Sequence, residues 1–529
     1  MTTPPGLTAA VFDDALREIR AAVGDEWVFT TPADTALYRD AYSLFWDEPE
    51  ERLASAAVAP ATVEQVQAVT RACNARGVPL YPISTGRNLG YGGSAPAYSG
   101  SVVLDLKRMD RVIEVDERNG SCIVEPGVSY FDMYRHLQSR GSRLWIDVPD
   151  PGWGSMIGNA LDFGGGYTAN PYRNHFEAHC GMEVVLADGE ILRTGMGALP
   201  GAQTWQQYRY GFGPYLDGLF KQSTLGITTK MGFWLFPQPE AYFTASINLP
   251  RYDDLPMLVD TIGELENANI FNGMPGISSP VLFRGGKNPL DFPEIPEGAE
   301  MDRLARETGL PCWSARLTFY GPEQVIRAQW AYAKSRFPTA SFTEHALVKL
   351  PLSPADMERI HKPSFGIPSL EMFAMGARSA HNPNPTDGHF WFSPIIPRTG
   401  EGFIAANRII RQTCQRLDIP VLLFSPPVSS WWRAFILVMA IPVHKDPARN
   451  QHLRAAVKEL IRVCADHGWG EYRTAPAFHD AVMDTYSYNN HIVRRVNERI
   501  KDALDPNGIL SVGRYGVWPK RLREQGGRK

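Results

Sequence analysis

Residues Tyr81 to Gly93 read YPISTGRNLGYGG and follow directly from an apolar, strand-like run. Four glycines, Gly86, Gly90, Gly92 and Gly93, fall within eight residues of this stretch. Glycine has no side chain to hold the backbone away from a ligand, so several backbone amides can converge on one anion such as a pyrophosphate. Arg87 is available to neutralise the same anion. The segment therefore predicts an anion or nucleotide site, with an irregular surface loop as the alternative.

The spacing of these glycines argues against the two commonest nucleotide motifs. It matches neither G-x-G-x-x-G nor G-x-x-x-x-G-K-[ST], so neither a Rossmann turn nor a P-loop is indicated. Two further glycine-bearing stretches follow, Gly152 to Gly166 (GWGSMIGNALDFGGG) and Ser223 to Gly232 (STLGITTKMG). Because all three lie in the first half of the chain, we expect them to form successive walls of one long groove.

The composition is that of an ordinary soluble globular protein. The chain has 529 residues, 44% hydrophobic and 21% charged, with a formal net charge of -4, which is enough for two or three domains. It has no sustained basic run outside a short tail, so we expect neither nucleic acid nor an anionic membrane as partner. Its six cysteines contain no C-x-x-C pair, which predicts free thiols and no metal site. With no signal pattern and no membrane-spanning stretch, the expectation is a cytoplasmic protein that acts on a small molecule.

Hydrophobic periodicity predicts an α+β first part. Apolar residues three or four apart favour a helix from Thr62 to Arg76, which opens with a Thr62/Gln65 capping-box spacing and closes at Gly77. Strand patterns follow at residues 78–83, 101–106, 111–115, 121–125 and 182–186.

The rest of the chain divides into two further regions. Pro237-Gln-Pro239 marks a boundary, and the region beyond it has helical periods with few glycine clusters, clearest from Leu453 to Cys464. The last sixty residues again have a composition rich in polar residues, aromatic residues and glycine. We therefore expect one domain at residues 1–238, a second at 239–471, and a segment at 472–529 that rejoins the first.

Eight ordered blocks resemble the vanillyl-alcohol oxidase and p-cresol methylhydroxylase family of flavoproteins. They are PISTGRNLGYGG, EPGVSYFDMY, DVPDPGWGSMIGN, LRTGMGALPG, YGFGPYLDGLF, GHFWFSP, GEYRT, and DPNGI followed by GRYGVWP. Eight blocks in order are far more specific than any one of them. The resemblance implies an α+β protein in which an FAD-binding domain of the p-cresol methylhydroxylase type, made of two α/β subdomains, is interrupted by an α+β cap domain with an antiparallel sheet. It also implies a homodimer.

The resemblance implies FAD as the cofactor and supplies candidate contacts for it. The pyrophosphate would lie on the amides of the opening loop, with further contacts from the other two glycine stretches and from the C-terminal segment. The candidates are Ser84, Thr85, Gly86, Arg87, Asn88, Leu89, Gly92, Gly93, Ser155, Gly158, Asn159, Gly226, Ile227 and Arg514.

His389 in GHFWFSP holds the position from which many family members bind the flavin 8α-methyl group covalently, so the resemblance predicts covalent FAD. A lone histidine is otherwise most often structural, and some relatives use tyrosine or bind FAD noncovalently. Certain relatives also have an N-terminal histidine near the linkage, whereas this chain has none before His136.

The activity that the resemblance implies is oxidation of para-substituted phenols by hydride transfer to flavin N5, giving a p-quinone methide. The enzyme must then hold a phenolate. Tyr91, Tyr472 and Arg473 match the family's phenolate-binding trio, and Asp150 matches the acidic residue near flavin N5. Tyr167 is a weaker candidate on the same wall. Each of these residues also has a plainer interpretation as a turn or rim residue.

The electron acceptor stays open at this point. The leading hypothesis is an oxidase that reduces O₂ to H₂O₂, and the alternatives are a dehydrogenase or hydroxylase with a cytochrome-like carrier, or a noncatalytic flavin-binding protein. Two segments depart from the family strings, GYTANPYRNH at Gly166 to His175 and VSSWWRAF at Val428 to Phe435. Trp431 and Trp432 in the second could stack on an additional aromatic ring of the substrate. We therefore expect an altered pocket mouth.

Overall fold

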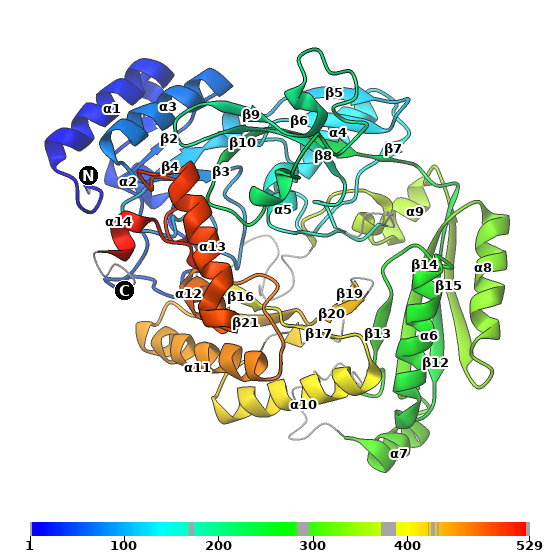
Figure 1. Cartoon of the computed structure of the whole chain (residues 1–529). Helices are drawn as coiled ribbons and strands as arrows, with labels where there is room; N and C mark the ends of the chain where they lie inside the picture. Colours follow the sequence, from blue (N-terminus) through cyan, green and yellow to red (C-terminus); the bar gives the residue numbers. More distant parts are fainter. Residues whose placement is uncertain are drawn as a thin grey trace.

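The computed structural model describes residues 3–168, 174–282, 296–371, 388–421, 423–424, 429–430 and 433–524. Figure 1 shows the N-terminal part with its sheets and helices at the top, the middle of the chain below it, and the C-terminal helices alongside the N-terminal part. The middle of the chain thus separates two segments that pack together.

The first sheet has the strand order β1 (Val28–Phe29), β2 (Ala56–Val58), β4 (Val102–Asp105) and β3 (Leu80–Ile83). Strands β2 and β3 run parallel to β4, whereas β1 is antiparallel to β2. Helices α1 (Ala9–Val23) and α3 (Val63–Arg76) share a buried core with this sheet.

The structure confirms the helix expected after Thr62. The Thr62 side chain accepts a hydrogen bond from the Gln65 amide, and the helix ends at Gly77, whose φ of 67° suits glycine. Strand β3 then leads directly into the glycine-rich loop.

The second sheet is antiparallel, in the order β5 (Val112–Asp116), β6 (Ser121–Val124), β10 (Ile227–Trp234), β8 (His179–Val185) and β9 (Ile191–Arg193). Helices α4 (Tyr130–Ser139) and α5 (Met156–Leu161) contribute to the core on this sheet. The strands expected near residues 111, 121 and 182 are all present. What the local patterns did not give is the pairing, because β6, β8 and β10 come from distant parts of the chain.

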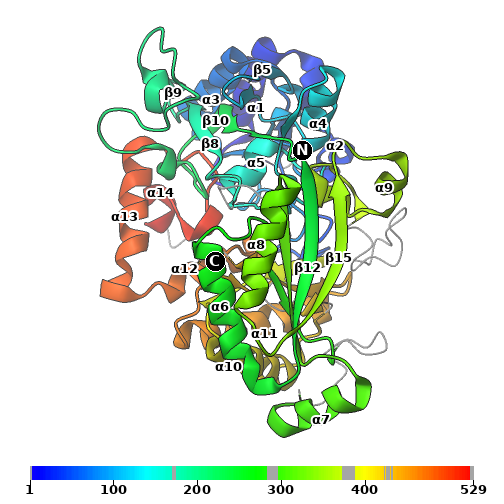
Figure 2. The same cartoon turned by 90° about the vertical axis from the view of Figure 1, so that its right-hand side faces the viewer.

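A third, antiparallel sheet lies beyond Pro239, in the order β13 (Gly276–Ser278), β14 (Trp313–Gly321), β12 (Ala241–Leu249) and β15 (Ser341–Lys349). Helices α6 (Leu255–Asn267) and α8 (Glu323–Ser335) lie along it, as Figure 2 shows, and α7 (Gly298–Thr308) lies at its far end. Helix α9 (Pro354–Arg359) follows the sheet and lies near the first domain. The expected antiparallel sheet of the second region is therefore confirmed.

Two small sheets complete the middle region. One has the order β16 (Gly388–Phe392), β21 (Met439–Val443) and β18 (Leu423–Phe424), and the other β17 (Ile395–Pro397), β20 (Ala434–Ile436) and β19 (Ser429–Ser430). Helices α10 (Gly400–Arg416) and α11 (Pro447–Asp466) bury their apolar faces in the same core. In α11 the buried positions include the expected Leu453, Val457 and Leu460.

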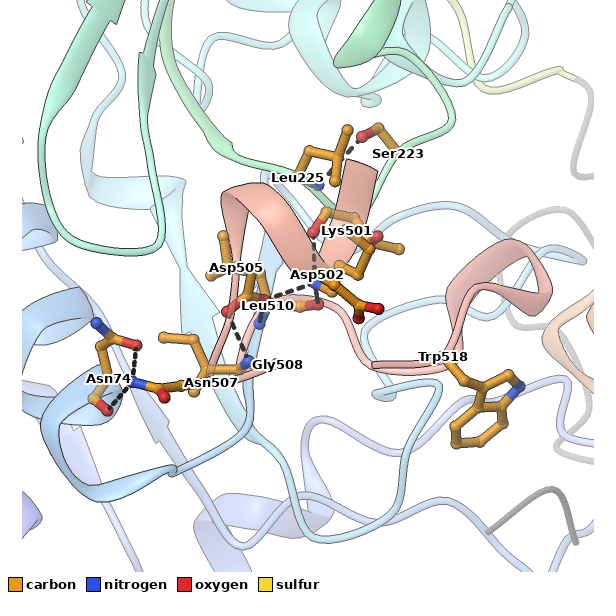
Figure 3. A network of polar contacts seen from close by, with 12 residues as sticks. Asn74, Ser223, Leu225, Lys501, Asp502, Asp505, Asn507, Gly508, Leu510 and Trp518 are labelled. Atoms are coloured by element: carbon orange, nitrogen blue, oxygen red, sulfur yellow. Dashed lines mark hydrogen bonds and ion pairs between the residues drawn. The ribbon is translucent and has the colours of Figure 1, made fainter. Parts of the chain in front are cut away.

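The C-terminal segment packs against the N-terminal part of the chain, with α12 (His479–Thr485), α13 (Tyr488–Leu504) and α14 (Lys520–Arg523). Leu510 forms a parallel bridge to Leu80 in β3. Figure 3 shows the polar network beside this bridge, in which the fully buried Lys501 ammonium lies 2.6 Å from Asp505. It also donates to the carbonyl oxygens of Thr224 and Leu510, at 2.7 and 2.6 Å. This ammonium joins the third glycine stretch to the C-terminal segment.

Two sequence expectations can be checked on the described residues directly. All six cysteines are free and buried. Within the described ranges, no helix is both long and apolar enough to span a bilayer.

Candidate active site

The glycine-rich loop adopts a backbone that other residues avoid. Gly86, Gly90, Gly92 and Gly93 have φ values of 66°, 80°, 112° and 55°, all in the left-handed region. Two of them also lie against neighbouring segments: a Cβ on Gly90 would be 2.7 Å from the Trp391 ring, and one on Gly92 would be 2.5 Å from Pro476. The glycines therefore serve both the turn of the loop and its close approach to β16 and the C-terminal segment.

One cavity lies between the three glycine stretches, and the C-terminal Arg514 also lines it. Twelve of the fifteen expected cofactor contacts line it: Ser84, Thr85, Gly86, Arg87, Asn88, Gly93, Ser155, Gly158, Asn159, Gly226, Ile227 and Arg514. Leu89, Gly92 and His389 are not among its lining residues. The glycine of α5 allows a close approach here, because a Cβ on Gly158 would lie 2.3 Å from the Ser84 hydroxyl. The expected common groove is thus present as a cavity.

His389 lies beside the glycine-rich loop, on strand β16. Its backbone oxygen is the atom that a Cβ on Gly90 would approach to 3.2 Å. Its ring lies 5.2 Å from that of Tyr42 and 4.6 Å from that of Trp391. Burial lowers the pKa of His389 to about 4. The imidazole is therefore neutral at neutral pH, with a nitrogen lone pair free of a proton.

Asp162 is the centre of a polar cluster on the cavity wall. It accepts a hydrogen bond from Asn88 Nδ2 at 2.9 Å and lies 3.5 Å from Arg473 Nη1 and 3.8 Å from Arg514 Nη2. The Tyr515 hydroxyl also donates to it. Two guanidinium groups facing one carboxylate leave one net positive charge in a nearly buried place. Sequence reasoning missed Asp162 and Tyr515, because nothing local in their segments indicates that they meet.

The structure brings the expected trio of Tyr91, Tyr472 and Arg473 together. The Arg473 guanidinium carbon lies 4.2 Å from the centroid of the Tyr91 ring and 5.0 Å from that of Tyr472. Burial raises the pKa of both tyrosines, although the Arg473 charge opposes that rise. Both therefore stay protonated at neutral pH and keep a hydrogen to donate. The Tyr472 hydroxyl here donates to the Phe163 carbonyl, whereas the buried Nε of Arg473 has no hydrogen-bond partner in the described part of the chain.

Asp150 is buried where the first domain meets the segment after α9. The Gly152 amide donates to the Ser369 carbonyl at 2.9 Å, and the Ser369 hydroxyl lies 3.5 Å from Asp150 Oδ1. Burial, with a smaller contribution from Glu371, raises the pKa of Asp150 to about 6. Burial and the Asp150 charge also raise the pKa of Tyr167. The two expected residues of this wall are thus electrostatically coupled.

A further ionisable residue that sequence reasoning missed lies beside Asp150. His361 Nε2 is 3.9 Å from Asp150 Oδ2, and the His361 ring packs edge-on against Tyr167 at 5.1 Å. Trp431 and Trp432, which we expected to stack on the substrate, and most of the inserted stretch before His175 lie outside the described residues.

Comparisons with known proteins define the class. Residues 54–195 match the model of the FAD binding domain, and this range contains the first two glycine stretches, which line one side of the cavity. The chain is an FAD-dependent oxidoreductase. Over 523 residues it is 30% identical to the 4-cresol dehydrogenase [hydroxylating] flavoprotein subunit of Pseudomonas putida, which covers 97% of each chain.

Solved structures agree over the whole length. The 4-ethylphenol oxidase from Gulosibacter chungangensis, in its isoeugenol complex, superposes with a TM-score of 0.84 at 36% identity, covering 99% of this chain and 100% of that one. p-Cresol methylhydroxylase with substrate bound gives 0.84 at 30% identity, covering 98% and 99%. The chain belongs to the vanillyl-alcohol oxidase and p-cresol methylhydroxylase family, and the α+β class and the FAD cofactor expected from the sequence are confirmed.

The residues around the cavity suit FAD chemically. Its walls combine left-handed glycines, hydroxyl and amide donors such as Ser84 and Asn159, and the cation Arg87. Such a set neutralises and hydrogen-bonds a pyrophosphate while the backbone stays close to it.

Proposed function

We propose that this protein oxidises 4-alkylphenols, holding the substrate as a phenolate against Arg473. The observation that carries the proposal is the buried cluster around Asp162, in which two guanidinium groups face one carboxylate. One uncompensated positive charge in a low-dielectric place favours one bound anion. Two similar proteins are named for phenolic substrates, 4-cresol and 4-ethylphenol, which supports a phenolate as the bound anion.

The energy that the site must supply is moderate. A free phenol has a pKa of about 10, and each unit of downward shift requires about 1.4 kcal/mol of preferential stabilisation of the anion. Three units would therefore need about 4 kcal/mol. Arg473 supplies a permanent charge and an Nε–H that has no partner among the described residues, and Tyr91 keeps its proton and can donate to the oxygen. Tyr472 also keeps its proton and can donate to the oxygen once it releases the Phe163 carbonyl.

FAD, when bound, supplies the acceptor for the hydride that leaves the benzylic carbon. The protein's own groups then control the resulting quinone methide. Asp150, with a pKa of about 6, is largely ionised at neutral pH and can take a proton from a water molecule that adds to this electrophile. In this proposal Arg473 orients and ionises the ring, and Asp150 governs the fate of the product.

The acceptor that we propose is O₂, with H₂O₂ as the product. The higher identity to a 4-ethylphenol oxidase than to a 4-cresol dehydrogenase supports this choice. The test is an aerobic panel of para-substituted phenols assayed for peroxide, together with stopped-flow reoxidation of the reduced protein by air. Rapid reoxidation with one peroxide per turnover is expected. Slow reoxidation by O₂ and fast reoxidation by a cytochrome c would favour the dehydrogenase instead.

We further propose that FAD is covalently bound through His389. A neutral imidazole beside the glycine-rich loop supports this, because only the unprotonated nitrogen can form the bond. Mass spectrometry of the denatured holoprotein should show the polypeptide with one FAD attached, and His389→Ala should release all of its FAD on denaturation. Complete release of FAD from the natural protein would contradict the link.

Three expectations from the sequence also remain proposals. We propose a homodimer, which light scattering of the holoprotein would test, and a cytoplasmic location, which fractionation of the source cells would test. We also propose domain boundaries at residues 238 and 471. Limited proteolysis should then cut first near these positions, and early cuts elsewhere would contradict them.

A further inference from the structure

His361 connects the buried carboxyl of Asp150 with the surface. The Asp150 side chain is 5% exposed, whereas that of His361 is 49% exposed, and their nearest atoms, Oδ2 and Nε2, are 3.9 Å apart. This distance is longer than a hydrogen bond, but catalytic contacts are often long before substrate binds, and one water can bridge such a gap. A carboxyl that takes up a proton at each turnover must also release it. On the basis of the proposed function, we propose that His361 passes this proton from Asp150 to solvent.

Local contacts hold the imidazole in the orientation that such a transfer needs. His361 Nδ1 lies 2.9 Å from the Ser364 hydroxyl, which leaves Nε2 on the Asp150 side. The Ser364 carbonyl accepts a hydrogen bond from Tyr320 at 2.8 Å, and the same Tyr320 hydroxyl lies 3.4 Å from the Tyr167 carbonyl. Strand β14, which contains Tyr320, therefore ties the histidine turn to the wall that contains Tyr167.

The proton affinities of the two groups converge. Burial raises the pKa of Asp150 to about 6, and burial lowers the pKa of His361 from its usual value of about 6.5. The charged neighbours are Glu371, which raises both values, and Arg316 on β14, which lowers that of His361. Lys362 pairs with Glu371 at 3.0 Å, and Tyr167 stays neutral. These opposite shifts bring the proton affinities of the two groups closer together, which favours proton transfer from Asp150 to His361 at each turnover.

The proton balance of the step is simple. Water forms a C–O bond to the benzylic carbon of the quinone methide, the exocyclic C=C bond opens, and the carbonyl oxygen of the ring becomes a phenolate. One water O–H bond breaks as its proton moves to the Asp150 carboxylate. The proton then moves from Asp150 to Nε2 of the neutral His361, and the imidazolium releases one proton to solvent. Asp150 and His361 return to their starting states, and no group is oxidised or reduced in this part of the cycle. His361 acts through Asp150 and is therefore a positioning residue.

The experiment compares His361→Gln with the natural holoenzyme, using 4-ethylphenol as the probe. Anaerobic flavin bleaching should proceed at the natural rate, because it precedes the transfer. Turnover should fall about ten- to hundredfold, at or below the lower end for a general acid–base group, and added imidazole should partly restore it. The exposed His452→Gln on α11 is the matched control, with no change expected. Unchanged turnover and an unchanged pH profile in His361→Gln would overturn the proposal.

Two further variants keep the result decisive. Should His361→Gln bind no FAD, Ser364→Ala takes its place: it keeps the imidazole but removes the hydrogen bond to Nδ1, and turnover should fall severalfold while bleaching does not change. Unchanged turnover in Ser364→Ala would then overturn the proposal. Asp150→Asn separates the two levels of inference. Slow turnover in Asp150→Asn together with natural turnover in His361→Gln would contradict only the proton relay. Natural turnover in Asp150→Asn would contradict the proposed role of Asp150 itself.

Discussion

The two sides of the active site use different chemical groups. On the cofactor side the structure uses backbone, with left-handed glycines and three chain segments packed too closely for a Cβ. On the substrate side it uses side-chain charges, with Arg473 facing Asp162 and Asp150 beside His361. A change on the first side should therefore impair folding and FAD content, whereas a change on the second should impair turnover of an enzyme that still contains FAD.

The largest effect is expected on the cofactor side, at Lys501. Lys501→Met removes a fully buried ammonium and leaves Asp505 without its cation, which typically costs about 3–5 kcal/mol. Because Lys501 also binds the Thr224 carbonyl beside Gly226, FAD content should fall with the thermal midpoint. Calorimetry and the flavin absorbance of the purified protein measure both. Lys458→Met on α11, at an exposed position, should change neither quantity. A thermal midpoint in Lys501→Met equal to that of the natural protein would contradict the role of Lys501 in holding the cofactor side together.

The next effect is expected on the substrate side, at Arg473. Arg473→Ala should lower the rate of flavin bleaching by 4-ethylphenol about 10²–10³-fold, as expected when a preorganised donor to a developing anion is removed. FAD content should stay near that of the natural protein. Arg473→Lys keeps the charge without the planar fork and should lie in between. A large loss of FAD in Arg473→Ala, with unchanged turnover per bound FAD, would reverse the assignment of this residue.

The pH dependence of product formation tests the role of Asp150 on the substrate side. Asp150 acts as a base only when ionised, and its pKa is raised to about 6. Formation of hydroxylated product should therefore fall about tenfold per pH unit below that value and level off above it. In Asp150→Asn this acidic limb should disappear together with most of the rate. A profile of hydroxylated product against pH measures it, and a limb that persists in Asp150→Asn would assign the titration to another group.

The smallest effect is expected at a single glycine of the loop. Gly93→Ala and Gly77→Ala both place alanine at positive φ, 55° and 67°, which costs about 1 kcal/mol each. Only Gly93 lines the cavity, and a Cβ there would lie 3.3 Å from Asp40 Oδ1, whereas a Cβ on Gly77 meets nothing within 4 Å. Gly93→Ala should therefore lose at least as much stability as Gly77→Ala in denaturant titrations, but only Gly93→Ala should bind FAD more weakly. Equal FAD affinity in the two would show that the loop glycines serve folding alone.

The same division explains what the sequence could predict. Helix α3 and the glycine-rich loop depend on neighbouring residues, such as Thr62 with Gln65, so local patterns were sufficient. The site residues Tyr91, Arg473 and His389 came from the resemblance to the family, because nothing in their own segments distinguishes them from rim residues. Asp162 and His361 could not be predicted from the sequence, because their partners lie far away along the chain. For Asp162 these are residues 473 and 514, and for His361 it is Asp150.

The central claim is that the substrate reacts as a phenolate held by Arg473, and one comparison of two compounds tests it most directly. The holoenzyme is mixed anaerobically with 4-ethylphenol or with 4-ethylanisole, its O-methyl ether, and the flavin absorbance is followed. The ether has the same benzylic carbon but cannot ionise. We expect 4-ethylphenol to bleach the flavin and 4-ethylanisole to leave it oxidised. Bleaching by both at similar rates would contradict the claim.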